Sequence, residues 1–308
     1  AGSVQHLPTP SDSAEVPAVF AAALAPLHGQ PALVAITGAS NVTGEVLPIA
    51  TIVEAAHRYG ARVVVDAAQL APHRAIDIAT LDVDYVAFSG HKLYAPFGAG
   101  ALVGRRDWLD DAPPYLSGGG ATYHVTVDDV GWYPAPARHE AGSPNVIGAV
   151  AIAAACDTLT ATGFDAIARH DEVLTMGLLD GLDRIDGVEV VSLFGADHDR
   201  VGIVTVQTQR PAAIVAAALS AEHGIATRDG AFCAHPLLHR LLPPLPTGHV
   251  PNALRVSVGV GSRADDVTVL LDALGSIAAE GPQWKYHAPA GRYIPNPDPR
   301  PRPSGIAG

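Results

Sequence analysis

Four short apolar segments and the amphipathic helix between the first two constrain the fold of this chain most strongly. The segments cover residues 33–36, 62–65, 85–88 and 100–103, and each has the length of a buried strand. Residues 48–59 carry apolar side chains at helical spacing, with Pro48 in the first turn and Gly60 after the end. This pattern predicts an α/β fold with a largely buried, mostly parallel sheet.

A second set of helices and strands follows. The predicted helices cover 145–162, 164–182, 211–223 and 264–279, and the predicted strands cover 188–191, 202–207 and 254–258. We therefore expect a large domain over 1–150 and a smaller C-terminal α/β domain over 151–280. Beyond them, Pro, Gly and Arg crowd residues 281–308 without periodicity, which predicts an extended or disordered tail.

Polar side chains follow three successive strands of the predicted large domain. They are Ser40 and Asn41 after the first strand, Asp66 and Gln69 after the second, and Ser89, His91 and Lys92 after the third. Because ligands collect outside the carboxyl ends of parallel strands, we expect these clusters to converge. Taken singly, Asn41 is also typical of a turn, Asp66 of a helix cap and Lys92 of a surface side chain.

Lysine is rare in this chain, which gives Lys92 particular weight. Of the 19 basic residues, only Lys92 and Lys285 are lysines. Arginine stays protonated in proteins, whereas a buried lysine can lose its proton. A lysine inside a structured segment therefore indicates a need for a neutral amine.

Together these side chains suit one cofactor, pyridoxal phosphate. Its chemistry needs an amine and an anion beside the pyridine nitrogen, so that the ring accepts electrons from the substrate Cα. Lys92 and Asp66 supply these groups. Four polar side chains remain for hydrogen bonds, Asn41 and Gln69 to the ring hydroxyl and Ser89 and His91 to the phosphate. No Walker or G-x-G-x-x-G loop competes for the ligand.

The formal net charge of −12 argues against nucleic acid and anionic lipid as partners, because no block of Lys or Arg offsets it. The apolar stretches break well before the roughly 20 residues that cross a bilayer, so we expect no membrane span. Cys156 and Cys233 are far apart and form no C-x-x-C pattern. They indicate neither a disulfide framework nor a metal site, and a reducing cytoplasm fits best.

Seven motifs carry a resemblance to a known family. The longest are S-N-V-T-G-E-V-L-P-I from Ser40, V-V-V-D-A-A-Q from Val63 and D-Y-V-A-F-S-G-H-K-L-Y-A-P-F-G-A-G-A-L from Asp84. The others are S-G-G-G at 117–120, R-H-E-A-G-S-P-N at 138–145, R-D-G-A-F-C-A-H-P at 228–236 and L-R-V-S at 254–257. In order and spacing they resemble class V aminotransferases, specifically the cysteine desulfurase and selenocysteine lyase branch. The resemblance covers nearly everything from Val4 to about Ala279.

The resemblance implies a pyridoxal-phosphate-dependent transferase of fold type I that forms a homodimer. It implies that Lys92 forms a Schiff base with the cofactor, that Asp66 meets the pyridine nitrogen and that His91 lies near the ring. Ser143 occupies the place from which the family reaches a phosphate across the dimer interface.

For the substrate, the resemblance implies that Arg255 clamps the carboxylate, with Arg228 and Asn41 as further substrate contacts. A planar guanidinium does this better than an amine. Cys233 lies in the loop where desulfurases carry the cysteine that attacks the substrate sulfur, which leaves a persulfide and L-alanine. The implied partners are a cysteine-like amino acid and a sulfur-acceptor protein. Cys156, inside an Ala-rich helix, is expected in the core.

The chain also departs from the family pattern. Family members carry a small-residue phosphate cup and a ring-stacking residue before the region that starts here. Nothing before Ser40 matches either, and His6 lies where the family has an extended strand. With Ala as the first residue, we expect a trimmed N-terminus and a large domain that is incomplete there. Two alternatives stay open: a class V aminotransferase or C–S lyase in which Cys233 is incidental, and a truncated, non-catalytic subunit.

Overall fold

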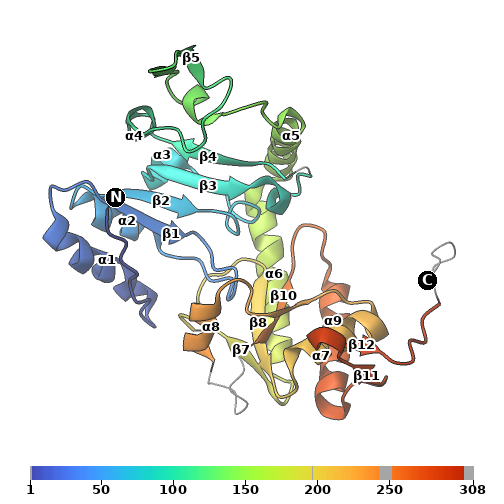
Figure 1. The fold of residues 1–308 in the computed structure, drawn as a ribbon. Helices are drawn as coiled ribbons and strands as arrows, with labels where there is room; N and C mark the ends of the chain where they lie inside the picture. Colours follow the sequence, from blue (N-terminus) through green and yellow to red (C-terminus); the bar gives the residue numbers. More distant parts are fainter. Residues whose placement is uncertain (1, 97, 196, 243–251, 302–308) are drawn as a thin grey trace. The chain divides into compact units, whose positions relative to one another are not determined.

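The computed structural model describes residues 2–96, 98–195, 197–242 and 252–301 (Figure 1). The chain forms two units. The first consists of Ala1–Ala39 and Leu47–Asp165, and the second of Ser40–Val46 and Ala166–Gly308. The short segment Ser40–Val46 therefore belongs to a different unit from the residues on either side of it.

A four-stranded sheet in the order β1-β2-β3-β4 forms the centre of the first unit. The strands are β1 (Leu33–Thr37), β2 (Arg62–Asp66), β3 (Tyr85–Ser89) and β4 (Gly100–Gly104). The first three run parallel and β4 runs antiparallel to β3, which confirms the mostly parallel sheet. Thr37 pairs with Asp66, and Asp66 pairs with Ala87. The carboxyl ends of the parallel strands therefore lie along one edge.

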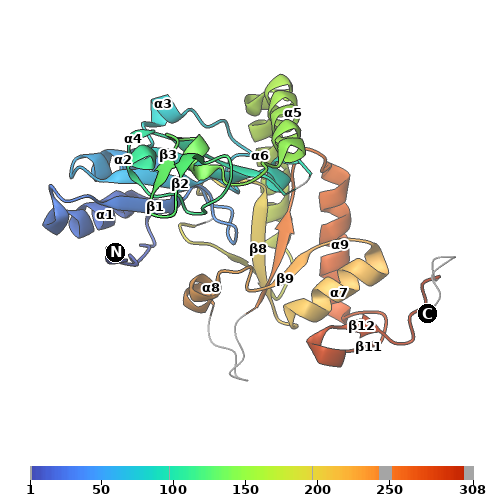
Figure 2. The same ribbon diagram turned by 45° about the horizontal axis from the view of Figure 1, so that its top comes forward.

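Helix packing covers β2 on one side of this sheet. The helices of the first unit are α1 (Val16–Leu24), α2 (Ile49–His57), α3 (Ile78–Leu81), α4 (Asp107–Asp111) and α5 (Val146–Thr162). α2 packs on β2 and against α1 (Figure 2). Strand side chains alternate between faces; Val63 and Val65 of β2 are buried, whereas Leu33 of β1 is 54% exposed. A hairpin of β5 (Thr122–Val125) and β6 (Val130–Trp132) also belongs to this unit.

The second unit contains an antiparallel sheet in the order β7-β8-β10-β9. Its strands are β7 (Val188–Val191), β8 (Ile203–Thr208), β9 (Arg228–Gly230) and β10 (Ala253–Ser257). Its helices are α6 (Phe164–Leu182), α7 (Ala212–His223), α8 (His235–Leu241) and α9 (Ala264–Glu280). α6, α7 and α9 bury one face of the sheet in a core that includes Leu178, Leu219, Leu254 and Leu274 (Figure 2). α8 and the segment Ser40–Val46 contribute to a smaller cluster, around Val42, Val191 and Leu238.

The division into units differs from the expected boundary at residue 150, because α5 stays with the first unit to Asp165. The end of the chain also differs from the expected extended or disordered tail. Tyr286–His287 (β11) pairs with Ile294–Pro295 (β12), and the Tyr286 hydroxyl donates to Glu222 Oε1 at 2.8 Å. Strands of two residues are too short to show periodicity in a sequence.

No single helix in the described part of the chain is long and apolar enough to cross a membrane. Only α5 and α6 taken together reach that length and hydropathy, as a pair that bends at the break between them. Gly163, with a φ of 88°, separates the two helices.

Candidate active site

Asp66 ends strand β2 in the first unit. Its side chain is exposed, and its Oδ1 accepts a hydrogen bond of 2.9 Å from the N–H of Ala68. Ala67 is tied to β3, because its N–H donates to Ala87 O at 2.8 Å. Gln69 follows in the same turn and is half-buried. The turn therefore presents a carboxylate and an amide directly after the strand.

Lys92 lies in the short 3-10 helix η3 (Gly90–Leu93), which begins directly after β3. The N–H of Gly90 donates to Ala99 O at 2.7 Å, and a Cβ at Gly90 would lie 2.6 Å from Cγ1 of Ile152 on α5. Only glycine allows this close approach. Lys92 itself is half-buried, and its amine has no hydrogen-bond or ion-pair partner within the residues described.

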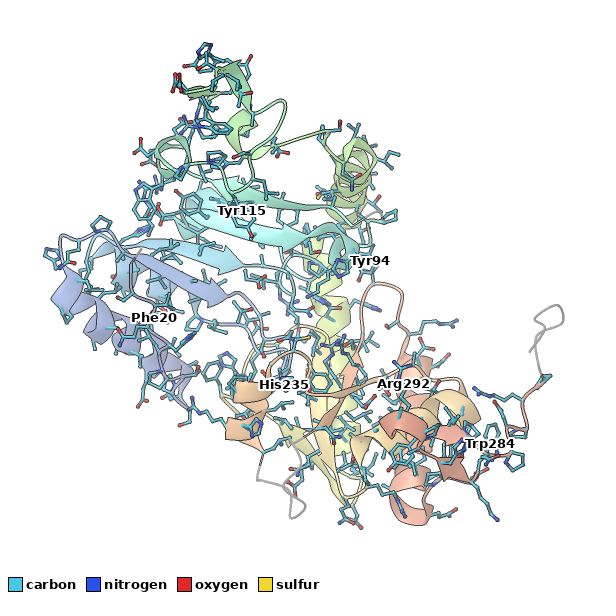
Figure 3. The ribbon with its side chains drawn as sticks, viewed as in Figure 1. Phe20, Tyr94, Tyr115, His235, Trp284 and Arg292 are labelled. Atoms are coloured by element: carbon cyan, nitrogen blue, oxygen red, sulfur yellow. The ribbon has the colours of Figure 1, made fainter. Side chains whose placement is uncertain are left out.

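Ser89, directly before η3, and His91, within it, add a hydroxyl and an imidazole. Ser89 Oγ lies 2.6 Å from Nδ1 of His91. Tyr94, at a φ of 66°, ends the short helix with its ring largely exposed (Figure 3). Since β2 and β3 are neighbouring parallel strands, Asp66 and Lys92 follow the same edge of one sheet.

Two further predicted residues lie on or near α5. Ser143 is exposed in the loop before this helix. Cys156 is only half-buried, which corrects the expectation of a core position. The cause is the helix itself, because α5 buries only Gly148 and Leu159 and leaves most of its apolar side chains accessible.

Cys233 belongs to the second unit and lies in a tight turn between β9 and α8. Phe232 and Cys233 have positive φ angles of 52° and 60°, and the N–H of Ala234 donates to Ala231 O at 2.8 Å. This is the pattern of a type I′ turn, which glycine and asparagine normally occupy. Side chains such as Phe and Cys are strained there, at a cost of about 1–2 kcal/mol each. The turn buries the Phe232 side chain and exposes the Cys233 side chain.

Two arginines lie beside this turn. Arg255 of β10 pairs directly with Arg228 of β9, so two like charges face each other across neighbouring strands. The Arg255 guanidinium lies 5.3 Å from the ring centroid of Phe232, and its Nε is buried without an acceptor among the described residues. Burial, and then the charge of Arg228, lower the pKa of Arg255, whereas the nearby Cys233 acts in the opposite direction.

Asn41 contacts both Arg255 and the cysteine turn. Its backbone oxygen accepts a hydrogen bond of 2.9 Å from Arg255, and its side-chain amide donates to Phe232 O at 2.8 Å. The sequence predicted that Asn41 joins the strand-end cluster, but the structure includes it in the second unit. The predicted residues divide into Asp66, Gln69, Ser89, His91, Lys92 and Ser143 in the first unit and Asn41, Arg228, Cys233 and Arg255 in the second.

Sequence reasoning missed two charged residues that support this second group. Glu45 is completely buried, and Arg200, 6% exposed, approaches one of its oxygens to 3.6 Å. One signal for Glu45 was available in the sequence, because it is the single acidic residue within the mostly apolar run V-T-G-E-V-L-P-I. A charge that is buried in such a segment needs a partner. The partner is distant in the sequence and could not be identified from it.

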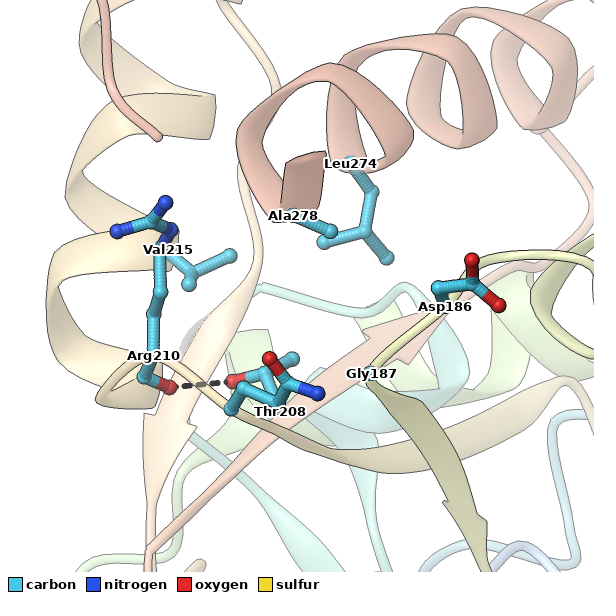
Figure 4. A pocket seen from close by; sticks show the side chains of 8 residues that line it. Asp186, Gly187, Thr208, Arg210, Val215, Leu274 and Ala278 are labelled. Atoms are coloured by element: carbon cyan, nitrogen blue, oxygen red, sulfur yellow. Dashed lines mark hydrogen bonds between the residues drawn. The ribbon is translucent and has the colours of Figure 1, made fainter. Parts of the chain in front are cut away.

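A separate crevice of the second unit lies at Asp186, Thr208, Arg210 and Leu274 (Figure 4). Thr208 Oγ1 donates to Arg210 O at 2.7 Å along its wall. Its cavity volume of about 10 Å³ holds at most about one water molecule. The crevice is therefore too small for an amino-acid substrate.

Comparison with protein families gives a match to the family described as Aminotransferase class-V, over residues 12–270. The cysteine desulfurase of Dickeya dadantii is 38% identical over 267 residues, which cover 86% of this chain and 60% of that protein. The cysteine desulfurase of Haloferax volcanii is 35% identical over 242 residues, which cover 79% and 55%. The chain thus spans less than two thirds of the length of these relatives.

Two solved structures show the same fold. The cysteine desulfurase CsdA of Escherichia coli superposes with a TM-score of 0.72 at 31% identity, over 82% of this chain and 61% of that chain. The apo cysteine desulfurase of Thermococcus onnurineus superposes with a TM-score of 0.79 at 28% identity, over 89% and 66%.

Proposed function

Because this chain belongs to the class V aminotransferase family, we propose that it acts as a pyridoxal-phosphate-dependent cysteine desulfurase. In this reaction L-cysteine becomes L-alanine and the sulfur passes to Cys233 as a persulfide. The observation that carries the proposal is the exposed Cys233 thiol on a strained turn beside two facing arginines. A thiol that served only packing would be buried.

The residues at the strand ends of the first unit fit pyridoxal phosphate chemically. Lys92 offers an amine without a partner within the described part of the chain, and Asp66 offers an oriented carboxylate on the neighbouring strand. We assign Lys92 to the aldehyde carbon and Asp66 to the pyridine nitrogen, with Gln69 at the ring hydroxyl. Ser89 and His91 would bind the phosphate. When bound, the cofactor draws electrons from the substrate Cα and makes its proton removable.

The facing pair of Arg228 and Arg255 supports a site for the substrate carboxylate. Like charges opposite each other on neighbouring strands repel, and an anion between them removes that repulsion. The buried Nε of Arg255 also lacks an acceptor within the residues described. A carboxylate supplies two oxygens in the planar geometry that a guanidinium recognises.

The remaining steps are assigned to Lys92 and Cys233. Lys92 takes the proton from the substrate Cα. The Cys233 thiolate then attacks the substrate sulfur, so that an S–S bond forms and the Cβ–S bond breaks. The electron pair of the broken bond stays with the carbon fragment. This fragment takes up two protons, the one that the Cys233 thiol released at Cβ and the one that Lys92 removed at Cα, and leaves as alanine. Arg255 lies close enough to Cys233 to interact with it electrostatically.

Replacing Cys233 by Ala tests this assignment. The variant should lose persulfide and alanine formation from L-cysteine by at least about a hundredfold and still bind pyridoxal phosphate, because the thiol acts only after the cofactor. Mass spectrometry detects the persulfide and amino-acid analysis detects alanine. Cys156→Ala, which removes the only other thiol, is the matched control. Undiminished sulfur release by Cys233→Ala would refute the desulfurase function.

The products also separate the alternatives. Transamination yields a keto acid, and C–S lysis yields pyruvate with ammonia. A non-catalytic subunit yields none of these products and takes up no pyridoxal phosphate.

We also propose that the chain forms a homodimer and passes its sulfur to an acceptor protein in a reducing compartment such as the cytoplasm. The dimer is supported by an apolar face of α5, in which Val146, Ile147 and Val150 are 62%, 65% and 64% exposed. Contiguous exposed apolar side chains of this kind are typical of protein interfaces. The exposed thiol of Cys233 is accessible to a second protein.

A further inference from the structure

The segment Ser40–Val46 is built tightly into the second unit. Thr205 of β8 alternates with Val204 and Val206 of the helix-covered core, so its side chain points to the opposite face, where its Oγ1 donates to Val42 O. Gly44 has a φ of 76°, and a Cβ there would lie 2.3 Å from Ile203 O. The segment therefore lies against β8 with no space for a larger residue at Gly44.

A buried carboxylate anchors this segment. Glu45 Oε1 accepts hydrogen bonds from Ser192 Oγ at 2.5 Å and from the N–H of Phe194 at 2.8 Å. Its Oε2 accepts from the N–H of Leu193 at 2.7 Å. Arg200 lies 3.6 Å from Oε1 and donates to Thr43 O at 3.1 Å. A charge that is buried with this many partners fixes the backbone that carries it.

Asn41 extends from the anchored segment to the cysteine turn. Its side-chain amide holds the carbonyl of Phe232, the residue before Cys233. Its backbone oxygen holds Arg255, which also lies over the Phe232 ring. The two contacts use different atoms, so a side-chain substitution removes the first and leaves the second.

We propose that Asn41 is a positioning residue, which holds the strained Phe232–Cys233 turn and thereby sets the orientation of the sulfur-accepting thiol. Glu45 acts one step further away, by fixing the segment from which Asn41 extends. The role of the thiol rests on the proposed desulfurase function. The positioning itself depends only on contacts inside the second unit.

Amide hydrogen exchange on the full chain tests the positioning directly. Asn41→Ala removes the donor, and Asn41→Asp keeps the shape but turns a carboxylate toward the Phe232 carbonyl. In both variants, exchange in residues 231–234 should accelerate about fivefold, the factor expected from the loss of one ordinary hydrogen bond. Exchange in β8 and α6 should stay unchanged, which shows that the fold is intact. Glu45→Gln should give a smaller acceleration in the same turn.

Glu54→Gln is the control, because Glu54 is an exposed residue of α2 that pairs with Arg58. Unchanged exchange in residues 231–234 of both Asn41 variants would overturn the proposal, whether or not the chain is active. In an active protein, Asn41→Ala should lower kcat at least about tenfold and change KM less than about twofold, since the Arg255 contact survives. A rise in KM with unchanged kcat would instead assign Asn41 to substrate binding. If the unsubstituted chain has no activity, the proposed function is refuted. The exchange measurement then still decides whether Asn41 holds the Phe232–Cys233 turn.

Discussion

Two lysines in one chain provide a comparison at the scale of single residues. Lys92 is half-buried after β3, in a helix whose position is fixed by the contact of Gly90 with α5. Lys285 is exposed close to the C-terminal hairpin. Both are amines of the same intrinsic basicity, so a difference in their reactivity would come from the surroundings alone.

Pyridoxal phosphate followed by borohydride should label Lys92 and leave Lys285 unmodified. Lys92 is half-buried and follows the same sheet edge as Asp66, whereas Lys285 is exposed. Peptide mapping after reduction identifies the modified residue. Lys92→Ala should lose the label and the visible absorption together, and Lys285→Ala should keep both. Labelling of Lys285 alone would contradict the assigned role of Lys92.

At the scale of elements, the sequence was most informative where periodicity is strong. α6 and β7 have the predicted bounds, and β1 to β4 each extend one residue beyond the predicted end. The polar clusters after β2 and β3 were also predictable, because parallel strands end on one edge. The exchange of Ser40–Val46 into the second unit was not, since it depends on the pairing of Glu45 with Arg200 across the fold. Neither residue has a local signal for its partner.

Asp84, just before β3, predicts how the first unit responds to acid. Burial opposes its ionisation, but hydrogen bonds of 2.8 Å from His57, the N–H of Val63 and Arg105 outweigh burial and hold its pKa below the usual value. A lowered carboxyl pKa stabilises the fold above the unfolded pKa near 4, and this contribution is lost as the pH falls through the lower folded value. Stability should therefore decline below about pH 4.

Asp84→Asn should destabilise the protein by about 1–3 kcal/mol at neutral pH and flatten the acid dependence, because the ionised acceptor is gone. Chemical denaturation at a series of pH values measures both effects. Asp157→Asn changes an exposed carboxylate of α5 and serves as the control. An equally steep acid dependence in Asp84→Asn would show that other carboxylates dominate.

At the scale of the whole molecule, apolar surface on α5 bears on assembly. Val150→Glu places a charge in the exposed apolar face of this helix and should dissociate a dimer that uses it. Light scattering should report twice the chain mass for the parent and the single-chain mass for this variant. Val173→Glu on α6 is the matched control, because Val173 is 67% exposed in the other unit. A parent that scatters as a single chain would refute the dimer.

The route of the backbone also limits how this protein can evolve. The chain enters the second unit at Ser40, returns to the first at Leu47 and enters the second again at Ala166. A recombination breakpoint at Asp165 would separate Glu45 from Arg200. It would also separate Glu45 from the two backbone N–H groups that donate hydrogen bonds to its carboxylate. No single breakpoint delivers either unit whole, because the chain crosses between the units after Ala39, Val46 and Asp165. The exchange of one unit for a foreign module therefore needs breakpoints at all three places.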